Sequence, residues 1–489
     1  MLPIAALQDA VAAPAAAADQ AGLGLRMILL LFVGGPILVV LWSRWVRPMN
    51  LALGYAATVA MWALSYVAML QPGIVAGEAL FAGALACVFA AGWVAGRRAP
   101  GEARGMSVGI VSATINLMVI GAFLRDEQGG SAVRPIAYVA GLYAASAVLG
   151  SLGDRLGRRS LPSGALPAPA TLMGIVATAN ILVMIVLGGL VTSYEAGLAV
   201  PDWPNSFGHN MLLYPVSEMK GGIFYEHAHR LFGMLVGATV LSFATLAFRS
   251  AVPAAARALA AVLVALVVVQ GILGGLRVTG NVTASMSAAD LAPDTRLAVV
   301  HGMLGQCVFA IAMIATFACG GALERVRVAV PGAASLRMLP TIALGALVLQ
   351  LFLGASMRHL QVPPTAEAGA RIPAWALHGH ITMALIAFIL VFLAGSRCAK
   401  ASDVPVLRVT GKAAMHTVGL QLLLGIGALV AVLLRRGADV PWWEAVSTTA
   451  HQALGALLLA IVATLAVLSR QVRPAADSAV PAGRVSASA

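Results

Sequence analysis

The sequence predicts an all-α polytopic membrane protein, in which an eight-helix core of two pseudo-symmetric four-helix bundles follows about five further transmembrane helices. Three observations support this class. The 489 residues are 60% hydrophobic and only 10% charged, which excludes an ordinary soluble domain. The apolar residues fall into runs of about 18 to 25, each long enough to cross roughly 30 Å of hydrocarbon. Finally, one local pattern recurs four times after residue 168.

Thirteen apolar runs are long enough to span a membrane. They lie at 25–44, 51–70, 77–95, 105–124, 134–151, 169–192, 222–248, 255–277, 296–319, 337–357, 373–396, 411–434 and 443–468. Lys and Arg cluster in alternate connections, and positively charged loops stay in the cytoplasm. We therefore expect a bacterial cytoplasmic membrane protein with its N-terminus outside and its C-terminus inside. The net charge of +12 follows from this bias and does not indicate nucleic acid binding.

The first five spans contain no histidine and almost no charge. A basic stretch that contains Pro162 and Pro167 follows them and predicts a boundary. The expected domains are an N-terminal membrane module of unknown role (1–165), a first bundle (166–325), a second bundle (326–470) and a disordered cytoplasmic tail (471–489).

A helix pair repeats four times after this boundary. The second span of each pair has a histidine near its outer end, and a small residue follows four positions later, on the same helix face. The first span has Gln or Met, followed four positions later by glycine. The histidines are His229, His301, His380 and His451, and the glycines are Gly188, Gly274, Gly354 and Gly425. Only the first pair has a long external insertion, Thr192 to Gly221, which we expect to cover the first bundle as an ordered lid.

The histidines of each bundle are predicted to meet at one depth. Two imidazoles on facing helices, each with a groove of small residues beneath it, suit a flat macrocycle with axial ligands on both faces. We interpret His229 with His301, and His380 with His451, as two haem-type sites. A lone histidine in a span is more often a core residue or part of a proton relay, but a fourfold pattern favours ligands. The other histidines break the pattern or are expected in loops or at the inner end of a span: His209, His227, His359, His378 and His416.

Glu226 lies three residues before His229 and four before Arg230, so the three share a helix face. One interpretation is an ion pair between Glu226 and Arg230; the other is a carboxylate close to the occupant of the first site. Arg277 and Arg358 could bind the propionates of a porphyrin, although lipid headgroups are the more common partner. The positions equivalent to Glu226 are Ala298, Trp375 and Ser447, so we expect one site to react and the other to supply electrons.

Several of these motifs together resemble the haem A synthase family, the assembly proteins of cytochrome oxidase. They are Gly188-Gly189, the loop Gly197 to Pro204, the stretch Gly221 to Arg230 and the three later span histidines. The resemblance covers about 170–470. It implies haem O as the substrate between His229 and His301, and a permanent haem b between His380 and His451. It also implies oxidation of the C8 methyl of haem O to the formyl group of haem A, with Glu226 as the catalytic residue.

The resemblance has limits. Many members carry a cysteine pair in the first external loop, where this chain has Val200 and Ser206, so we expect no thiol relay. The five N-terminal spans lie outside the family pattern. Haem O synthase and cytochrome oxidase subunits are the implied partners; a homo-oligomer is compatible with the sequence, and no electron donor is implied.

Two other classes of protein stay open from the sequence. A dihaem b-type cytochrome for quinol-linked electron transfer would need neither a carboxylate at one site nor an exchangeable haem. A transporter with a histidine proton relay would need no haem at all.

Overall fold

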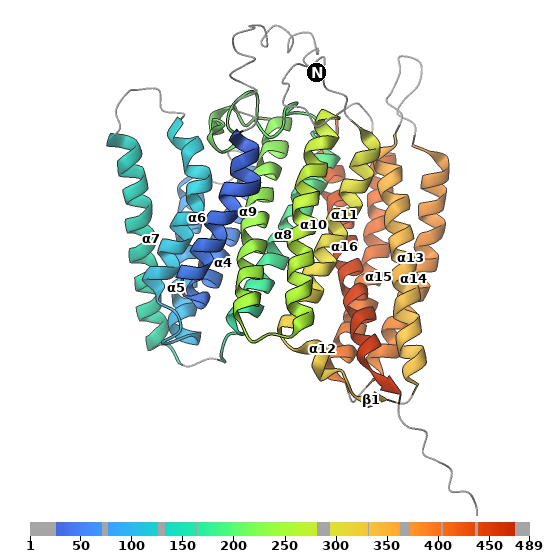
Figure 1. Cartoon of the computed structure of the whole chain (residues 1–489). Helices are drawn as coiled ribbons and strands as arrows, with labels where there is room; N and C mark the ends of the chain where they lie inside the picture. Colours follow the sequence, from blue (N-terminus) through green and yellow to red (C-terminus); the bar gives the residue numbers. More distant parts are fainter. Residues whose placement is uncertain are drawn as a thin grey trace, which may run out of the picture.

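The computed structural model describes residues 26–70, 77–125, 133–161, 164–280, 294–330, 332–361, 372–401, 404–435 and 439–474. Long helices stand side by side in this part of the chain, with α4 to α7 at one edge, α13 to α15 at the other and α8 to α11 between them (Figure 1). The all-α polytopic class predicted from the sequence is confirmed. The predicted tail (471–489) lies mostly outside the described residues.

The N-terminal helices are close to the predicted ranges. They are η1 (Leu30–Gly34), α3 (Gly35–Trp45), α4 (Pro48–Met69), α5 (Gly77–Arg98), α6 (Gly105–Arg125) and α7 (Val133–Arg159). The first span is interrupted, because η1 is a π-helical segment that runs directly into α3. Pro36 near the start of α3 explains this interruption, since proline has no N–H and its ring clashes with the carbonyl four residues earlier.

The core contains four antiparallel helix pairs, as the repeat predicts. They are α8 (Pro169–Ser193) with α9 (Gly222–Arg249), α10 (Ala254–Thr279) with α11 (Thr295–Cys319), α13 (Ala333–His359) with α14 (Ala374–Ala399), and α15 (Pro405–Leu434) with α16 (Trp442–Gln471). The short elements are η2 (Met211–Leu213), η3 (Val216–Glu218), α12 (Ala322–Arg325), β1 (Ala329–Val330) and β2 (Arg473–Pro474).

Twelve of the thirteen predicted spans form helices that are long and apolar enough to cross a membrane. The remaining predicted span corresponds to α6. Among the residues whose side chains are described, its apolar stretch covers Gly105–Val119 and is shorter than the other twelve. Basic residues occupy the last turns of α5, α7, α9, α14 and α16. The assignment of this end to the cytoplasm stays a prediction.

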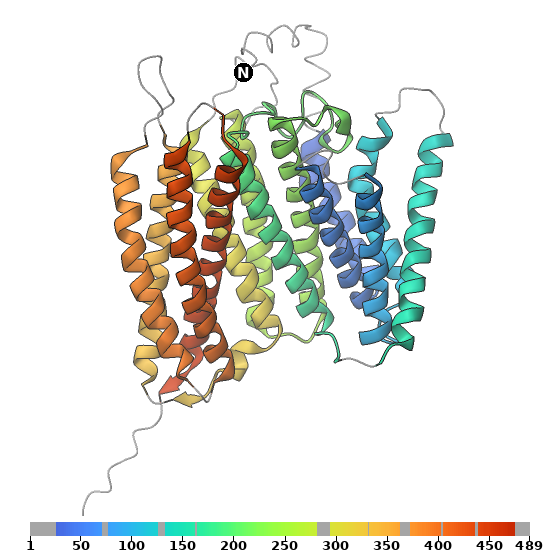
Figure 2. The same ribbon diagram turned by 180° about the vertical axis from the view of Figure 1, so that it is seen from behind.

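The two halves of the core meet along α8, α11, α13 and α16, which contact one another. Figure 2 shows α8 and α16 together from behind the view of Figure 1. At the end with the basic residues, β1, which precedes α13, and β2, which follows α16, form a parallel two-stranded pair. At the opposite end, the loop Tyr194 to Gly221 covers α9 and α10; we call it the lid loop.

The N-terminal helices share a hydrophobic core with the first bundle, because α3 and α4 pack on α8 and α9. Trp62 and Tyr66 of α4 lie against Phe232 of α9, with ring centroids 5.4 and 6.1 Å apart. Tyr66 also stacks on Phe224 at 5.2 Å. The predicted module therefore packs directly on the helix that carries Glu226 and His229, a contact that apolar composition alone does not reveal.

Within the N-terminal block, α5, α6 and α7 pack backbone against backbone. Glycine allows this approach, because a β-carbon at these positions would collide with a neighbouring backbone or side chain. At Gly150, for example, the β-carbon would lie 2.2 Å from the carbonyl oxygen of Gly105. The glycines are Gly92 and Gly96 in α5, Gly105 and Gly109 in α6, and Gly150, Gly153 and Gly157 in α7.

We predict that Gly150→Ala lowers the thermal denaturation midpoint of the purified protein, because separating α6 from α7 costs about 1–3 kcal/mol or more. Gly141→Ala in the same helix is the matched control, since a β-carbon there meets no atom within 4 Å. Equal midpoints for the two variants would contradict the packing described.

Candidate functional site

Each predicted histidine faces the glycine of its own helix pair. A β-carbon at Gly188 or Gly274 would lie 3.1 Å from Cε1 of His229 or His301, respectively. A β-carbon at Gly354 or Gly425 would lie 2.9 Å from Cε1 of His380 or His451, respectively. A side chain larger than hydrogen would push each imidazole away, so these glycines create the space in which the histidines stand.

The four histidines meet in two pairs, as predicted. The ring centroids of His229 and His301 are 6.5 Å apart, and those of His380 and His451 are 6.3 Å apart. An imidazole nitrogen binds a transition metal such as zinc at about 2.0–2.1 Å and lies about 1.1 Å from its ring centre, so two axial imidazoles on one metal have centroids roughly 6 Å apart. Both pairs fit a bis-imidazole haem. We call His229 with His301 the first site and His380 with His451 the second site.

The two sites differ in how firmly the protein holds the rings. At the second site, His380 Nδ1 lies 3.2 Å from the backbone carbonyl oxygen of Gln350, and His451 Nδ1 lies 3.1 Å from Nε2 of Gln421. The two side-chain amides also lie 3.3 and 3.5 Å from Nε2 of His380 and His451, respectively. A carbonyl that accepts the ring N–H, as at His380, orients a metal-binding histidine. At the first site, Nδ1 of both imidazoles is buried without a hydrogen bond of good geometry among the described residues, and only the His301 ring has a nearby backbone partner, Gln270. The second site therefore has the more fixed ligand geometry.

The glutamines follow the repeat, and one copy departs from it. Gln270 donates to the backbone carbonyl of His301 at 2.7 Å, on the face where Gly305 leaves room. In the first pair Met184 replaces glutamine and packs near Gly233, 3.4 Å from its β-carbon position. His229 thus lacks the amide contact found in the other pairs.

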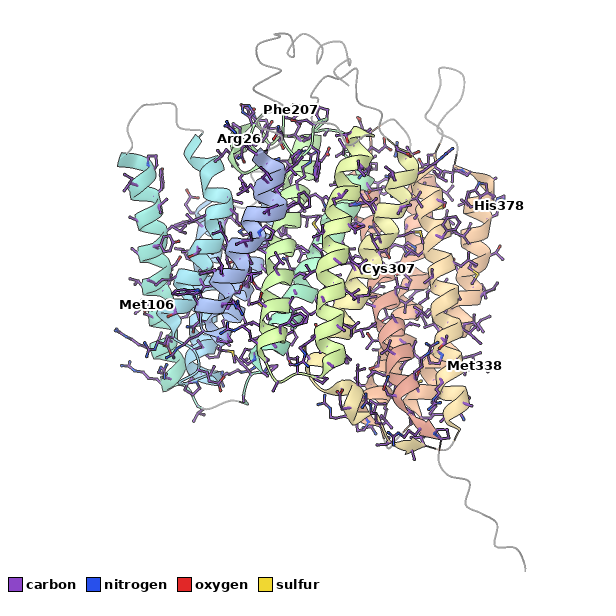
Figure 3. The ribbon with its side chains drawn as sticks, in the orientation of Figure 1. Arg26, Met106, Phe207, Cys307, Met338 and His378 are labelled. Carbon is purple, nitrogen blue, oxygen red and sulfur yellow. The ribbon has the colours of Figure 1, made fainter. Side chains whose placement is uncertain are left out.

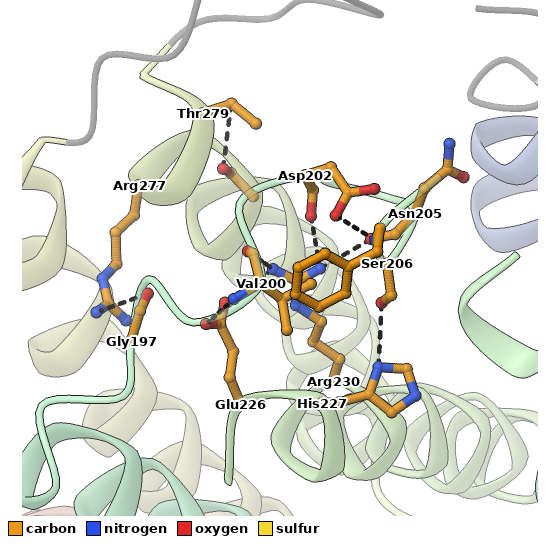
Figure 4. Close-up of polar contacts among 12 residues, drawn as sticks. Gly197, Val200, Asp202, Asn205, Ser206, Glu226, His227, Arg230, Arg277 and Thr279 are labelled. Carbon is orange, nitrogen blue, oxygen red and sulfur yellow. Dashed lines mark hydrogen bonds and ion pairs between the residues drawn. The ribbon is translucent and has the colours of Figure 1, made fainter. Parts of the chain in front are cut away.

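The lid loop is held to α9 by the predicted Glu226 and Arg230 ion pair. Nη2 of Arg230 lies 2.8 Å from Oε1 of Glu226, and Oε2 of Glu226 accepts a bond from the Val200 amide at 2.9 Å (Figure 4). Arg230 also donates to the carbonyl oxygens of Val200, Asp202 and Asn205 at 2.8, 2.6 and 2.9 Å, respectively. Glu226 is only 4% exposed, and both of its oxygens are occupied. The ion pair is therefore part of a clamp on the lid loop.

Further contacts fix the lid loop from within. Both oxygens of Asp202 accept bonds from backbone amides, those of Phe207 and Gly208. Ser206, which stands where many members of the resembling family have cysteine, lies 3.0 Å from Nδ1 of the fully buried His227. His227 thus contacts the lid loop.

The lid loop also contacts helices outside the first pair. The Trp203 ring lies on Gly275 of α10, where a β-carbon would come within 2.3 Å of it. The same ring lies 6.1 Å from that of Phe32 in η1. Arg277 of α10 approaches the Gly197 carbonyl oxygen at 3.4 Å (Figure 4). The lid is therefore an ordered element packed on both the core and the N-terminal helices.

Three other histidines lie on helices, one of them away from its expected place. His359 was expected in a loop but ends α13, with Nε2 3.6 Å from the β-carbon position of Gly302, next to His301. His416 lies in the N-terminal half of α15, which begins at Pro405, six residues before the predicted span. His378 is exposed near the start of α14, and Figure 3 shows it at the edge of the molecule.

A charged group near the second site was not predicted from the sequence. Glu444 is 4% exposed and lies seven residues, or two turns, before His451 on α16. Arg435 contacts both Glu444 and Glu195 of the lid loop, at 3.4 and 3.7 Å. Arg358 donates to the Thr192 carbonyl and lies within electrostatic range of both carboxylates. The seven-residue spacing from His451 could have identified Glu444.

We predict that Gly425→Ala weakens haem binding at the second site by roughly 10- to 100-fold, the usual effect of displacing a supporting contact of a metal ligand. Gly427→Ala is the control, because a β-carbon there meets nothing within 4 Å. Haem per protein, measured on purified samples by the pyridine haemochrome spectrum, checks the prediction. Unchanged haem content in Gly425→Ala would contradict it.

Comparison with known proteins places these residues in a family. The chain matches the family described as cytochrome oxidase assembly protein over residues 171–463, which comprises most of α8 to α16 and both histidine pairs. No curated protein matches the chain. The match covers more than half of the sequence, so the chain belongs to the haem A synthase family of cytochrome oxidase assembly proteins.

Proposed function

We propose that this protein is a haem A synthase that oxidises the C8 methyl of haem O to the formyl group of haem A. The observation that carries the proposal is the pair of bis-histidine sites with unequal surroundings. The second site, His380 with His451, has glutamine contacts that suit a permanent haem b. The first site, His229 with His301, lacks such contacts on its rings and suits a haem that must leave as product.

The lid loop supports the same assignment. It packs on α9 and α10, which belong to the first bundle, and on η1. A covered site keeps water away from a reactive intermediate. The iron of a bound haem would supply the oxidation chemistry, while the chain's own residues bind, orient and cover the substrate. Haem O synthase and cytochrome oxidase subunits are the proposed partners for delivery and acceptance.

The proposal predicts that haem A appears when the protein is produced together with haem O. The pigments are extracted and identified by mass, and His229→Ala should remove haem A while the haem b spectrum persists. A protein that retains two haem b groups and forms no haem A would instead be a dihaem cytochrome. Colourless protein made with ample haem would favour a transporter.

We further propose Glu226 as the catalytic residue. Its carboxylate lies one turn before His229, and it could accept a proton or stabilise positive charge as the methyl group is oxidised. Accepting a proton would weaken its bonds to Arg230 or to the Val200 amide, so the reaction and the clamp would be coupled.

We predict that Glu226→Gln lowers haem A formation about 10²- to 10⁴-fold while haem O still binds and haem b is retained. Arg230→Lys is the comparison variant, because it keeps the charge but loses the planar fork that holds the lid loop. If Glu226 serves only the clamp, both variants should open the loop to protease to the same extent and lose activity equally. Wild-type haem A production by Glu226→Gln would exclude the catalytic role.

A further inference from the structure

Arg277 lies at a position that points to the first site. It follows Gly274, which faces His301, by three residues and so lies about one turn closer to the lid loop on the same side of α10. Its guanidinium is within electrostatic range of His229, His301 and Glu226. It is half-buried beneath the lid loop rather than turned towards the lipid.

The lid loop is shaped around this guanidinium. Gly197 lies so close that a β-carbon there would come within 2.0 Å of Nη2 of Arg277. The hydrogen bond between this nitrogen and the Gly197 carbonyl is long, at 3.4 Å, and therefore weak. Only a glycine at position 197 allows this approach. The single weak hydrogen bond leaves most of the hydrogen-bonding capacity of the guanidinium unused among the described residues.

The charge of Arg277 has no matching carboxylate in the part of the chain that the structure describes. A guanidinium has five N–H donors, and among the described residues Arg277 uses one of them. Glu226 is within electrostatic range, but it bonds to Arg230 and to the Val200 amide, and no hydrogen bond among the described residues joins it to Arg277. The oxygens of Asp202 are taken by two backbone amides. A half-buried cation with unused donors is favoured by an anion that joins it.

We propose that Arg277 binds a propionate carboxylate of the macrocycle at the first site and thereby sets the rotation of the macrocycle in its plane. This inference rests on the proposed function. Both propionates lie on one edge of a haem, so a single guanidinium at the lid end of the site distinguishes that edge from the other three. Arg277 is then a positioning residue, which determines the methyl group that is presented for oxidation.

The second site offers a contrast. Arg358 occupies the comparable place, four residues after Gly354, but it bonds to the Thr192 carbonyl and has Glu195 and Glu444 within electrostatic range. Its charge is therefore balanced by the protein. Arg277, which has no bonded carboxylate among the described residues, instead lies at the first site, where the proposed ligand is the substrate.

The test compares haem O with its dimethyl ester, in which both propionates are uncharged. Binding at the first site is followed by difference spectra on the purified full chain, with the second site already filled. A charge-assisted hydrogen bond predicts that wild-type protein binds the diester roughly 10- to 100-fold more weakly than the diacid. In Arg277→Gln the two ligands should bind with nearly equal affinity, and Arg277→Lys should give an intermediate ratio.

Arg296→Gln is the control, because Arg296 is exposed at the same end of the bundle and should keep the wild-type ratio. An unchanged spectrum of the second site shows that each variant is folded. If the ratio in Arg277→Gln equals that of the wild type, or if the wild type does not prefer the diacid, the propionate role of Arg277 is wrong. If the first site of the wild type binds no haem O, the proposed function fails as well.

Discussion

The contact between a glycine and an imidazole is the constraint on which both sites depend. In each of the four helix pairs, a glycine on the first helix leaves room for a histidine on the second. The contact fixes the depth of the ring and the separation of the two helices together. Because it recurs in every pair, the pseudo-symmetric bundles bring their histidines to centroid separations of 6.5 and 6.3 Å without further adjustment.

Departures from the repeat give the first site its own character. Met184 replaces glutamine in the first pair, and the insertion between α8 and α9 becomes the lid loop. Arg230 holds that loop through three backbone carbonyls and Glu226, all within reach of one planar guanidinium. The second pair of histidines instead has glutamine contacts and a balanced charge group with Glu444. The two similar bundles thus carry different sites. The lid loop packs on the first bundle, whereas the histidine rings of the second site have more polar contacts.

Local spacing made the histidines, their glycines and the ion pair of Glu226 with Arg230 predictable from the sequence, because residues four apart share a helix face. Contacts between distant spans were not predictable. Apolar helices resemble one another in composition, so nothing in the sequence indicated that Tyr66 would stack on Phe224 or that Arg435 would reach Glu444. The π-helical start of the first span was also missed, although Pro36 was a signal.

Helix α8 lies between the two sites. Two consecutive glycines on it face helices of different sites. Gly188 faces His229, while a β-carbon at Gly189 would lie 3.0 Å from Oε1 of Gln452, the neighbour of His451. Beyond them, Ser193 bonds to Thr448 and Thr449 of α16 at 2.9 and 3.2 Å, just before the lid loop begins. Helix α8 therefore contacts His229 of the first site and α16 beside the second site, and it leads directly into the lid loop. A displacement of α8 at the first site would press on α16 beside His451, since close-packed helices transmit strain.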